Sequence, residues 1–331
     1  MNAIVLAGGF GSRLRPLTDT VPKPMLKIAN VPMLDYVVAW LAFYGFTDIT
    51  FTLGYLPEIV RNFVSDYKGI KTRFTLETEP LGTAGAVKNA ETYLDDIFVV
   101  ASGDALCDIN LAKMLDFHLS GGAEVTMACA TVKNPRLYGV VNADDDGTIN
   151  GFIEKPQTSD YGNLVNAGVY IMNKSALAFV PQGVKFDFSR ELFPSLVSAR
   201  KIKAFVHRGY WCDIGDKESY YRANYFMKDG GFYPRVPSFT GERYRSKLSR
   251  DNLLSKSAVT VGYAANSIIG ENARIASGAA ISDCIVLDDA LVNCRRRFCI
   301  IGKDFVEELP GLALSDASRI DKTDKIFQTG I

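Results

Sequence analysis

The stretch Leu6–Pro16, LAGGFGSRLRP, decides the fold of this chain, because a Gly-rich turn follows directly after a short apolar strand at residues 3–6. Such a turn lets backbone N–H groups approach a phosphate without interference from Cβ atoms. The glycines miss the dinucleotide-binding pattern, since Leu14 stands where the third glycine belongs, and no GxxxxGK[ST] loop occurs in the chain. The sequence therefore predicts a phosphate-binding turn of another type, with these candidate nucleotide contacts: Leu6, Ala7, Gly8, Gly9 and Gly11.

Two cations near this turn add the charge that a triphosphate needs. Arg13 offers a planar fork, and Lys23 offers a point charge on a backbone that Pro22 and Pro24 restrict. The chain as a whole is neutral, with 37 basic and 37 acidic residues, so the basic N-terminal segment suits a small anionic ligand rather than nucleic acid. A solvated basic rim beside an ordinary turn is the alternative.

Outward from the turn, short β-branched runs alternate with segments of helical periodicity. This alternation predicts a mostly parallel sheet with helices on both faces, whose ligands bind at the carboxyl ends of the strands. Strands are predicted at 3–6, 49–53, 73–77, 97–101 and 125–132, and helices at 33–44, 58–67, 84–93 and 112–120.

Residues 138–215 change to short strands and turns, which predicts an insertion of β structure covering one side of the sheet. A helix is predicted at 217–228. The Pro-, Gly- and charge-rich stretch that follows predicts a linker. The predicted division is a first domain at 1–232, a linker at 233–255, and a second domain with a C-terminal tail at 256–331.

The second domain repeats every six residues. Ile269, Ile275, Ile281 and Leu287 are separated by small or turn residues, and this period is typical of a parallel β-helix in which each short face buries one side chain. Alternation in a plain sheet is the other interpretation. The period breaks at Asn293, and about two coils are predicted, so an open end of the helix favours a homo-oligomer.

Composition places the chain among ordinary globular proteins, with 331 residues, 47% of them hydrophobic. The short apolar N-terminus has no preceding basic region and predicts a first strand, not a secretory signal, and no apolar run reaches the length of a membrane span. Six cysteines without a CxxC motif indicate reduced thiols rather than a zinc site or a disulfide framework. The expected location is the cytosol.

Seven motifs in fixed order resemble the sugar-1-phosphate nucleotidyltransferases over residues 1 to about 228. They are LAGGFGSRLRPLT with the PKP at 22–24, EPLGTAGA at 79–86, SGD at 102–104, YGVV at 138–141, IEKP at 153–156, NAGVY at 166–170 and WCDIG at 211–215. The resemblance implies a Rossmann-like α/β nucleotidyltransferase domain, and the hexapeptide tail resembles members that end in a left-handed parallel β-helix. It also implies transfer of a nucleoside monophosphate from an NTP to a sugar 1-phosphate, with release of pyrophosphate.

Site residues follow from the same resemblance. It implies that Asp104 and Asp213, both in strand-end sequences, hold a Mg²⁺ ion that bridges NTP and sugar phosphate, and two carboxylates suffice for such an ion. By resemblance the catalytic set is Arg13, Lys23, Asp104 and Asp213, with Arg13 on the departing pyrophosphate and Lys23 on the α-phosphate. The sugar phosphate is expected to meet these residues: Asp104, Gly139, Glu154, Lys155, Asn166 and Gly168. Turn or cap aspartates, and an exposed Glu154–Lys155 pair, are the alternatives.

The turn after residue 76 resembles the base-reading segment of the family. Its candidate nucleotide contacts are Glu77, Glu79, Pro80, Gly82 and Thr83. A carboxylate accepts well from the N1–H and N2–H₂ donors of guanine, and it also accepts from the single N3–H of uracil or thymine. The sequences LGTAGA, GDALCDI, FDFSRELFP and GYWCDIG are most similar to mannose-1-phosphate guanylyltransferases. GTP and mannose 1-phosphate are therefore the first choice, and UDP- or dTDP-sugar synthesis is the second.

Three other functions compete with an active transferase. A catalytically silent regulatory relative is disfavoured because Arg13, Lys23, Asp104 and Asp213 are all present. A hexapeptide acyltransferase usually needs a histidine, and none follows His207. Nucleic-acid binding rests only on the Arg295–Arg297 cluster, which is expected to face solvent or a neighbouring subunit.

Overall fold

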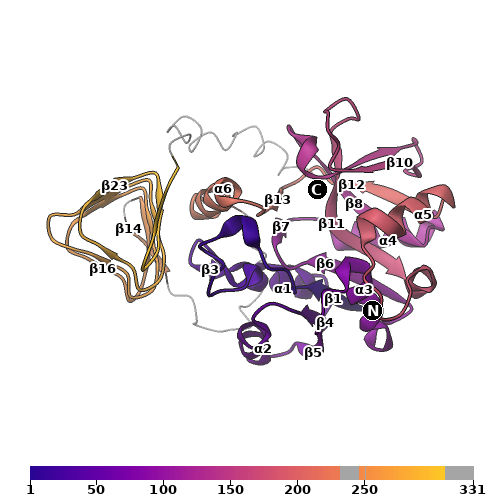
Figure 1. The fold of residues 1–331 in the computed structure, drawn as a ribbon, viewed down its shortest axis with the longest axis horizontal. Coiled ribbons are helices and arrows are strands. Elements are labelled where there is room, and N and C mark those ends of the chain that lie inside the picture. Colours follow the sequence, from indigo (N-terminus) through magenta and orange to yellow (C-terminus); the bar gives the residue numbers. More distant parts are fainter. Residues whose placement is uncertain (232–245, 250, 310–331) are drawn as a thin grey trace. The chain divides into compact units, whose positions relative to one another are not determined.

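The computed structural model describes residues 1–231, 246–249 and 251–309 (Figure 1). The chain divides into two compact units. The first contains Met1–Phe10, Pro22–Pro24 and Val37–Asp213, and the second contains Gly11–Val21, Met25–Tyr36 and the chain from Ile214 onward. The N-terminal segment thus passes between the units several times before Val37. The domain limits inferred from sequence stay a prediction.

A nine-stranded sheet organises the first unit, and its main path runs β10-β9-β11-β6-β1-β4-β5. The strands β1, β4, β5 and β6 are parallel neighbours, which confirms the predicted parallel core. The strands β8 to β11 are antiparallel to their neighbours other than β12, which is parallel to β8. The predicted β insertion at 138–215 therefore extends this sheet and does not cover one of its sides. The strands are β1 Asn2–Leu6, β4 Asp48–Leu53, β5 Lys71–Leu76, β6 Ile97–Ser102, β8 Val125–Thr131, β9 Gly139–Ala143, β10 Ile149–Glu154, β11 Leu164–Asn173 and β12 Ile202–Val206.

The first four helices of the chain occur at the predicted places, and α5 was not predicted. The helix α4 shows the local reasons, because Asn110 caps its first turn by accepting from Lys113 N at 2.9 Å and Gly122 ends it with a φ of 65°. The predicted helix at 84–93 is divided, since α3 ends at Asn89 and a 3₁₀ turn follows. The helices are α1 Met33–Phe43, α2 Pro57–Ser65, α3 Gly82–Asn89, α4 Leu111–Gly121 and α5 Phe193–Ser198.

One hydrophobic cluster lies between the sheet and the elements α3, α5 and Phe188–Leu192. Ile4 and Phe98 contribute from adjacent parallel strands, and the rings of Phe188 and Phe193 stack with centroids 5.4 Å apart. Burial of such side chains contributes roughly 1.5–3 kcal/mol each. This packing fixes the strand ends on which the site is built. Among the described residues no helix is long and apolar enough to cross a membrane.

The second unit joins α6 (Lys217–Lys228) to the β2–β3 hairpin of Lys27–Ile28 and Val31–Pro32. The two-residue turn has positive φ at Ala29 (49°) and Asn30 (67°), as a tight hairpin requires. From α6, Asn224 accepts the Ala29 N–H at 2.8 Å and the Tyr220 hydroxyl donates to Lys27 O at 2.8 Å. These bonds hold the hairpin on the helix.

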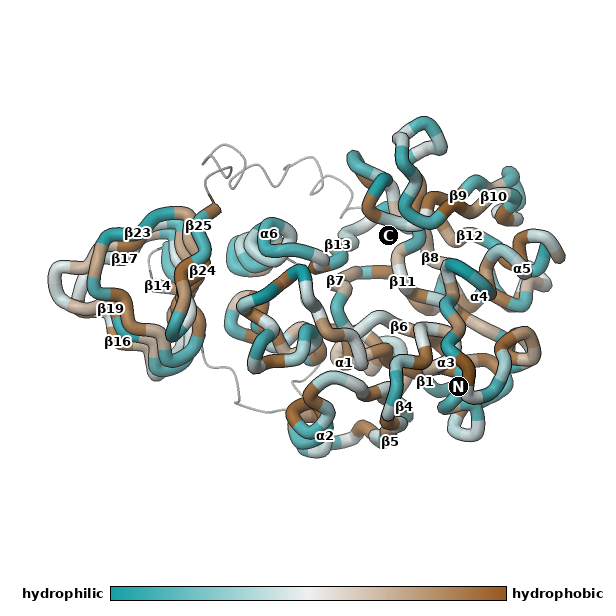
Figure 2. Tube along the Cα trace, in the orientation of Figure 1, coloured by the Kyte–Doolittle hydropathy of each residue, from teal (hydrophilic) through white to brown (hydrophobic). Residues whose placement is uncertain are grey.

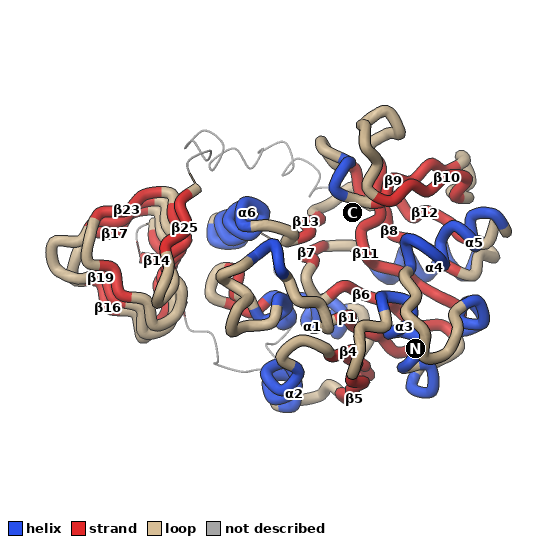
Figure 3. Tube along the Cα trace, viewed as in Figure 1, coloured by secondary structure: helices blue, strands red, loops and turns tan. Residues whose placement is uncertain are grey.

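The rest of this unit is a three-faced parallel β-helix of short strands and loops (Figure 3). Hydrophobic strand positions alternate with hydrophilic turns along it (Figure 2). The faces are β15 Asn252–Ser255, β18 Ile268–Ile269, β21 Ile285–Val286 and β24 Cys299–Ile301; β16 Val259–Thr260, β19 Arg274–Ile275 and β22 Leu291–Val292; and β17 Tyr263–Ala265, β20 Ala280–Ser282 and β23 Arg295–Arg297. The predicted β-helix is confirmed.

One detail of the predicted repeat is wrong. Ile269, Ile275 and Ile281 are buried as expected, but the next inward side chain is Val286, whereas Leu287 is half-buried. The turn after Ile281 is one residue shorter, which shifts the register. The coil continues beyond the break in the period at Asn293, because β23 pairs in parallel with β20 and β24 with β21.

Asn and Asp side chains stabilise the corners of the coil. Asn266, Asp283 and Phe298 share one corner with φ between 43° and 53°, and Asn266 Nδ2 donates to Asp283 Oδ1 at 2.8 Å. The Arg297 Nε bonds the other Asp283 oxygen at 3.3 Å. Arg296 pairs in register with the inward Ile281 and is half-buried, so not all of the arginine cluster faces solvent as predicted.

Strand pairs border the β-helix at both ends of its largest face. The strand β14 (Ser246–Ser249) is antiparallel to β15, and β25 (Val306–Glu308) is antiparallel to β24. Within the predicted linker, the described residues 246–249 and 252–255 are therefore paired strands. The linker residues 233–245 and 250, and the predicted tail beyond 309, lie outside the described residues.

Candidate active site

The Gly-rich turn leaves the carboxyl end of β1, beside the ends of β4 and β6. Ala7 N donates to Thr52 O at 3.1 Å, and Gly8 O accepts from Tyr55 N at 3.2 Å. Gly8 and Gly54 pack closely, since a Cβ on Gly54 would lie 2.7 Å from Gly8 O. Gly9 is exposed, and a Cβ there would meet nothing within 4 Å. The turn is thus closely packed at Gly8 and open at Gly9.

Lys23 joins two carboxylates at this strand edge. Its Nζ lies 2.5 Å from Asp104 Oδ2 and 3.6 Å from Asp213 Oδ1, and the Lys23 side chain is only 11% exposed. Asp104 follows β6, whose Ser102 is in register with Leu6 of β1. Three residues predicted from sequence as catalytic therefore meet at the carboxyl ends of parallel strands.

A small strand pair brings Asp213 to Asp104. The strand β13 (Trp211–Asp213) is antiparallel to β7 (Ala105–Cys107), with Asp213 opposite Ala105. The Trp211 indole anchors this pair by donating to Ala167 O at 2.8 Å. This anchoring role of Trp211 was not predicted from the sequence, although an aromatic side chain two residues before the candidate metal ligand Asp213 could have indicated it.

An irregularity in β11 places the predicted sugar contacts near the same edge. The register with β8 shifts between Asn166 and Tyr170. Within this irregularity Gly168 has a φ of 73°, and a Cβ on it would contact Ser102 Oγ. Asn166 Oδ1 accepts from Gly168 N, and its Nδ2 donates to the Tyr170 hydroxyl, both at 2.9 Å. The Asn166 amide is thus oriented by its own strand.

The β9–β10 hairpin presents Gly139, Glu154 and Lys155. Gly139 pairs with Glu154, and a Cβ on Gly139 would lie 2.5 Å from the Phe152 ring and 2.9 Å from Glu154 Oε2. Lys155 has a φ of 47°, an uncommon backbone conformation for a side-chain-bearing residue, and its Nζ lies 3.6 Å from Glu154 Oε1. The exposed Lys155 ammonium is therefore displayed by a constrained backbone.

Glu77 lies between the Gly-rich turn and the start of α3. Its Oε2 accepts from Leu81 N at 2.9 Å, and its Oε1 faces Gly8, where a Cβ would approach it to 3.2 Å. Burial raises the pKa of Glu77, and the Leu81 hydrogen bond opposes that rise. Glu79 and Pro80 are exposed on the following turn.

Gly82 and Thr83 serve the local fold in this structure. Gly82 has a φ of 70°, and a Cβ there would lie 2.7 Å from Phe186 O. The Thr83 hydroxyl accepts from Phe188 N at 2.9 Å. The segment predicted to read the base is therefore held in place by residues 186–188, a contact that the sequence did not predict.

Gly11 and Arg13 belong to the second unit, in a 3₁₀ turn at Ser12–Leu14. Gly11 has a φ of 61° and its carbonyl accepts from Leu14 N and from the Thr18 hydroxyl, both at 2.9 Å. Arg13 is exposed. Their predicted roles toward a nucleotide stay predictions.

No covalent nucleophile emerges from the described cysteines and histidines. Burial raises the pKa of Cys107 to about 12 and raises that of Cys129 further, which keeps both thiols protonated. His118 contacts Thr126 and Asn173, and burial lowers its pKa. His207 lies 2.9 Å from Asp108 Oδ1 and contacts Tyr210 O. Both imidazoles have structural partners.

Comparison with known proteins agrees with the motifs. A family model described as Nucleotidyl transferase matches residues 2–230. A mannose-1-phosphate guanyltransferase of Candida albicans is 38% identical over 228 residues, which are 66% of this chain and 62% of that protein. A mannose-1-phosphate guanylyltransferase of Mycobacterium tuberculosis is 31% identical over 298 residues, which are 88% of this chain and 81% of that protein.

A solved structure shows the same fold. The structure of HddC from Yersinia pseudotuberculosis complexed with GMP-PN has a TM-score of 0.58 and 31% identity, over 68% of this chain and 99% of that one. The chain spans 62% of the length of the first-named fungal relative. Similarity is thus broad over the first 230 residues and extends further in the mycobacterial protein.

Proposed function

Because the chain belongs to the nucleotidyl transferase family, we propose that it transfers GMP from GTP to mannose 1-phosphate, forming GDP-mannose and pyrophosphate. The relatives from Candida albicans and Mycobacterium tuberculosis, both named for mannose 1-phosphate and guanylyl transfer, support this choice of substrates. UDP- and dTDP-sugar synthesis remain the alternatives that the assay below separates.

The cluster of Lys23, Asp104 and Asp213 is the observation that carries the proposal. A buried ammonium between two carboxylates at the carboxyl ends of β1 and β6 occupies the place where open α/β sheets bind ligands. Phosphoryl-group chemistry needs positioning and charge neutralisation rather than a covalent nucleophile. The site offers a cation, two acids and open backbone N–H groups.

The donor set fits Mg²⁺. Asp104 and Asp213 supply hard oxygen ligands that approach the same Lys23 Nζ, so one small cation can be reached by both. Among the described residues no group of three or more His, Cys, Asp or Glu side chains is placed to hold a metal. Two carboxylates plus substrate phosphates suffice for Mg²⁺. When bound, the ion would neutralise phosphate charge and orient both substrates.

The protein's own residues then have separate tasks. The Gly8–Gly9 backbone receives the triphosphate, Lys23 neutralises the α-phosphate, and Arg13 stabilises the departing pyrophosphate. The sugar phosphate oxygen attacks the α-phosphorus as the bond to pyrophosphate breaks, so no group is left on the enzyme. Lys155 holds the sugar phosphate, while Glu154, Asn166, Gly139 and Gly168 bind the hydroxyl groups.

Glu77 is the proposed base-reading residue. One oxygen is engaged by Leu81 N and the carboxylate faces the Gly-rich turn. Its remaining lone pairs suit the adjacent N1–H and N2–H₂ donors of guanine. Glu79 is exposed and sits on the turn that Gly82 closes, so Glu77 is the better placed of the two acids.

A substrate matrix tests the proposal. Pyrophosphate release is measured with Mg²⁺ for GTP, UTP, dTTP, ATP and CTP against the 1-phosphates of mannose, glucose and N-acetylglucosamine. We expect release with GTP and mannose 1-phosphate above every other pairing. Preference for UTP or dTTP would replace the substrate assignment, and no release in any well by folded protein would favour a silent nucleotide-sugar-binding relative.

A further inference from the structure

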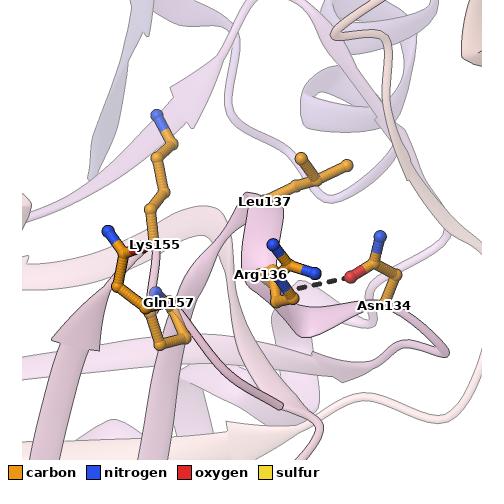
Figure 4. A pocket seen from close by; sticks show the side chains of 6 residues that line it. Asn134, Arg136, Leu137, Lys155 and Gln157 are labelled. Atoms are coloured by element: carbon orange, nitrogen blue, oxygen red, sulfur yellow. Dashed lines mark hydrogen bonds between the residues drawn. The ribbon is translucent and has the colours of Figure 1, made fainter.

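A pocket on the β9–β10 side of the first unit contains residues to which the proposed function gives no role. Its volume is about 410 Å³, enough to hold a sugar phosphate. The walls come from the 3₁₀ turn Pro135–Leu137 with the preceding Asn134 and from the segment just after β10 (Figure 4). The lining residues are Asn134, Arg136, Leu137, Lys155, Pro156 and Gln157.

The lining has the chemistry of an anion site. It includes two cations, Arg136 and Lys155, two amides, Asn134 and Gln157, and no carboxylate. Arg136 is exposed and makes no ion pair within the described part of the chain. The guanidinium therefore keeps its fork of donors available, and such a fork binds phosphate oxygens in a bidentate manner.

Both walls have constrained backbones. Lys155 N donates to Tyr138 O at 2.9 Å, its φ is 47°, and the next residue, Pro156, is buried. On the other wall, Asn134 Oδ1 caps the turn by accepting from Arg136 N at 3.4 Å. A ligand would consequently meet cations whose main chains are already ordered, which lowers the entropy cost of binding.

Described contacts connect this pocket to the carboxylate cluster. Tyr138, which accepts from Lys155 N, packs edge-on against Trp211 with centroids 5.2 Å apart. Trp211 shares β13 with Asp213, one of the two acids around Lys23. A chain of contacts through Tyr138 and Trp211 thus links the backbone of the pocket to the strand that carries Asp213.

We propose that Arg136 is a substrate-binding residue that captures the phosphate of the sugar 1-phosphate, with Asn134 and Gln157 as neutral hydrogen-bonding partners beside Lys155. The inference rests on the proposed transferase function and deepens it. Phosphate oxygens could also come from the NTP, but the pocket is built on the β9–β10 hairpin rather than on the Gly-rich turn, so the sugar 1-phosphate is the assigned source.

Steady-state kinetics of Arg136→Ala test this assignment, with both substrates varied. Loss of one charge-assisted pair at an exposed site predicts a rise of about tenfold in KM for the sugar 1-phosphate, little change in KM for the NTP, and a nearly unchanged kcat. Arg136→Lys should recover part of the affinity. Lys133→Ala is the matched control, because it removes an exposed cation from the same loop outside the pocket lining.

Each outcome decides the inference. An unchanged KM for the sugar 1-phosphate, an equal effect of Lys133→Ala, or a rise in the KM for the NTP instead would overturn it. If the wild-type chain releases no pyrophosphate, the proposed function fails separately. Calorimetric binding of inorganic phosphate then still tests the pocket: weaker binding by Arg136→Ala than by Lys133→Ala supports an anion site, and equal binding refutes it.

Discussion

At the scale of single residues, Asp104 and Asp213 both pair with Lys23, at 2.5 Å and 3.6 Å, but different elements place them there. Asp104 follows β6 directly, whereas Asp213 depends on the three-residue pairing of β13 with β7. Both acids face the same ammonium, so each is expected to contribute to the metal site. The two aspartates are therefore best tested as a matched pair.

Replacement of either aspartate by asparagine keeps the side-chain shape and removes one anionic ligand. We expect Asp104→Asn and Asp213→Asn each to lower kcat by about 10²–10³-fold, as for loss of other oriented charge-stabilising groups. Thermal unfolding should change little, because Lys23 retains the other carboxylate. The measurement is pyrophosphate release at saturating substrates, and wild-type turnover by either variant would refute the ligand assignment.

Glu77 carries a second prediction at this scale, on both pH dependence and base choice. Burial raises its pKa, so the folded state holds the proton more tightly than the unfolded state, and the associated stability is present at low pH and lost as pH rises through the raised pKa. Glu77→Gln does not titrate and can still accept from Leu81 N. The free energy of unfolding of Glu77→Gln, relative to that of wild type, should therefore increase from acidic to neutral pH.

Base choice gives an independent readout of the same variant. Glutamine presents one acceptor and one donor group in place of two acceptors, so guanine loses a partner for one of its two donors. Activity with GTP should fall relative to that with UTP and dTTP. Parallel urea titrations and NTP competition assays measure the two effects, and an unchanged GTP preference would remove Glu77 from the base-reading role.

The sequence predicted the chemistry of single residues better than it predicted the contacts between them. Lys23 between two prolines pointed to phosphate binding, and the apolar run before Asp104 placed this acid at a strand end, while its role toward a metal came from the family resemblance. The Lys23–Asp213 contact needed the β7–β13 pairing of three-residue strands far apart in sequence, which no local pattern predicts. The roles of Trp211 and Arg136 emerged only with the packing around Tyr138 and Lys155.

At the scale of elements, the β9–β10 hairpin depends on a glycine with no space for a side chain. Gly139→Ala would place a Cβ 2.5 Å from the Phe152 ring, which itself packs on Phe193 at 5.7 Å. Overpacking of this kind costs about 1–3 kcal/mol. We expect a lower free energy of unfolding and a higher KM for the sugar 1-phosphate, measured by urea denaturation and steady-state kinetics.

The open Gly-rich turn provides the control for that glycine. Gly9→Ala meets nothing within 4 Å, so its free energy of unfolding should stay close to that of wild type. Equal stability of Gly139→Ala and Gly9→Ala would contradict the close packing of the hairpin.

Helices and strands were predicted well because their apolar period is a local feature of the sequence. The register and the corners of the β-helix were not predicted. The helix at 217–228 was predicted with the bounds that the structure gives it. In the β-helix, strict six-residue counting placed Leu287 inside, but a shorter turn after Ile281 turns Val286 inward. The left-handed backbone of Asn266 and Asp283 marks such corners, so the Asn and Asp positions carried a signal that counting apolar residues alone omitted.

At the scale of the whole molecule, the second unit combines N-terminal and C-terminal segments. The hairpin at Lys27 bonds to Tyr220 of α6 and pairs with Asp288 of the β-helix at 2.7 Å. Tyr221 and Tyr225, both fully buried, donate to Asp283 O and Asn266 O at 2.8 Å. The β-helix is consequently part of the folding unit that contains α6 and the segment after Lys23, and not an independent appendage.

Truncation after Gly231 tests this architecture. Loss of the β-helix would expose the rings of Tyr221 and Tyr225, which as buried aromatics cover about 150–250 Å² each. We expect a lower Tm and stronger binding of a hydrophobic dye than for Tyr225→Phe, which keeps the ring and loses only its hydroxyl. A truncated chain as stable as the full chain would contradict a shared core. Formation of a homo-oligomer stays a prediction, which light scattering of the full chain can test.

In the proposed reaction an oxygen of the sugar phosphate attacks the α-phosphorus of the nucleotide. Mannose 1-phosphate carrying ¹⁸O in its non-bridging phosphate oxygens, incubated with GTP, Mg²⁺ and the intact chain, tests it by mass spectrometry of both products. We expect GDP-mannose to retain all of the label and pyrophosphate to carry none. Label in pyrophosphate or inorganic phosphate, or no GDP-mannose from folded protein, would contradict the proposed transfer.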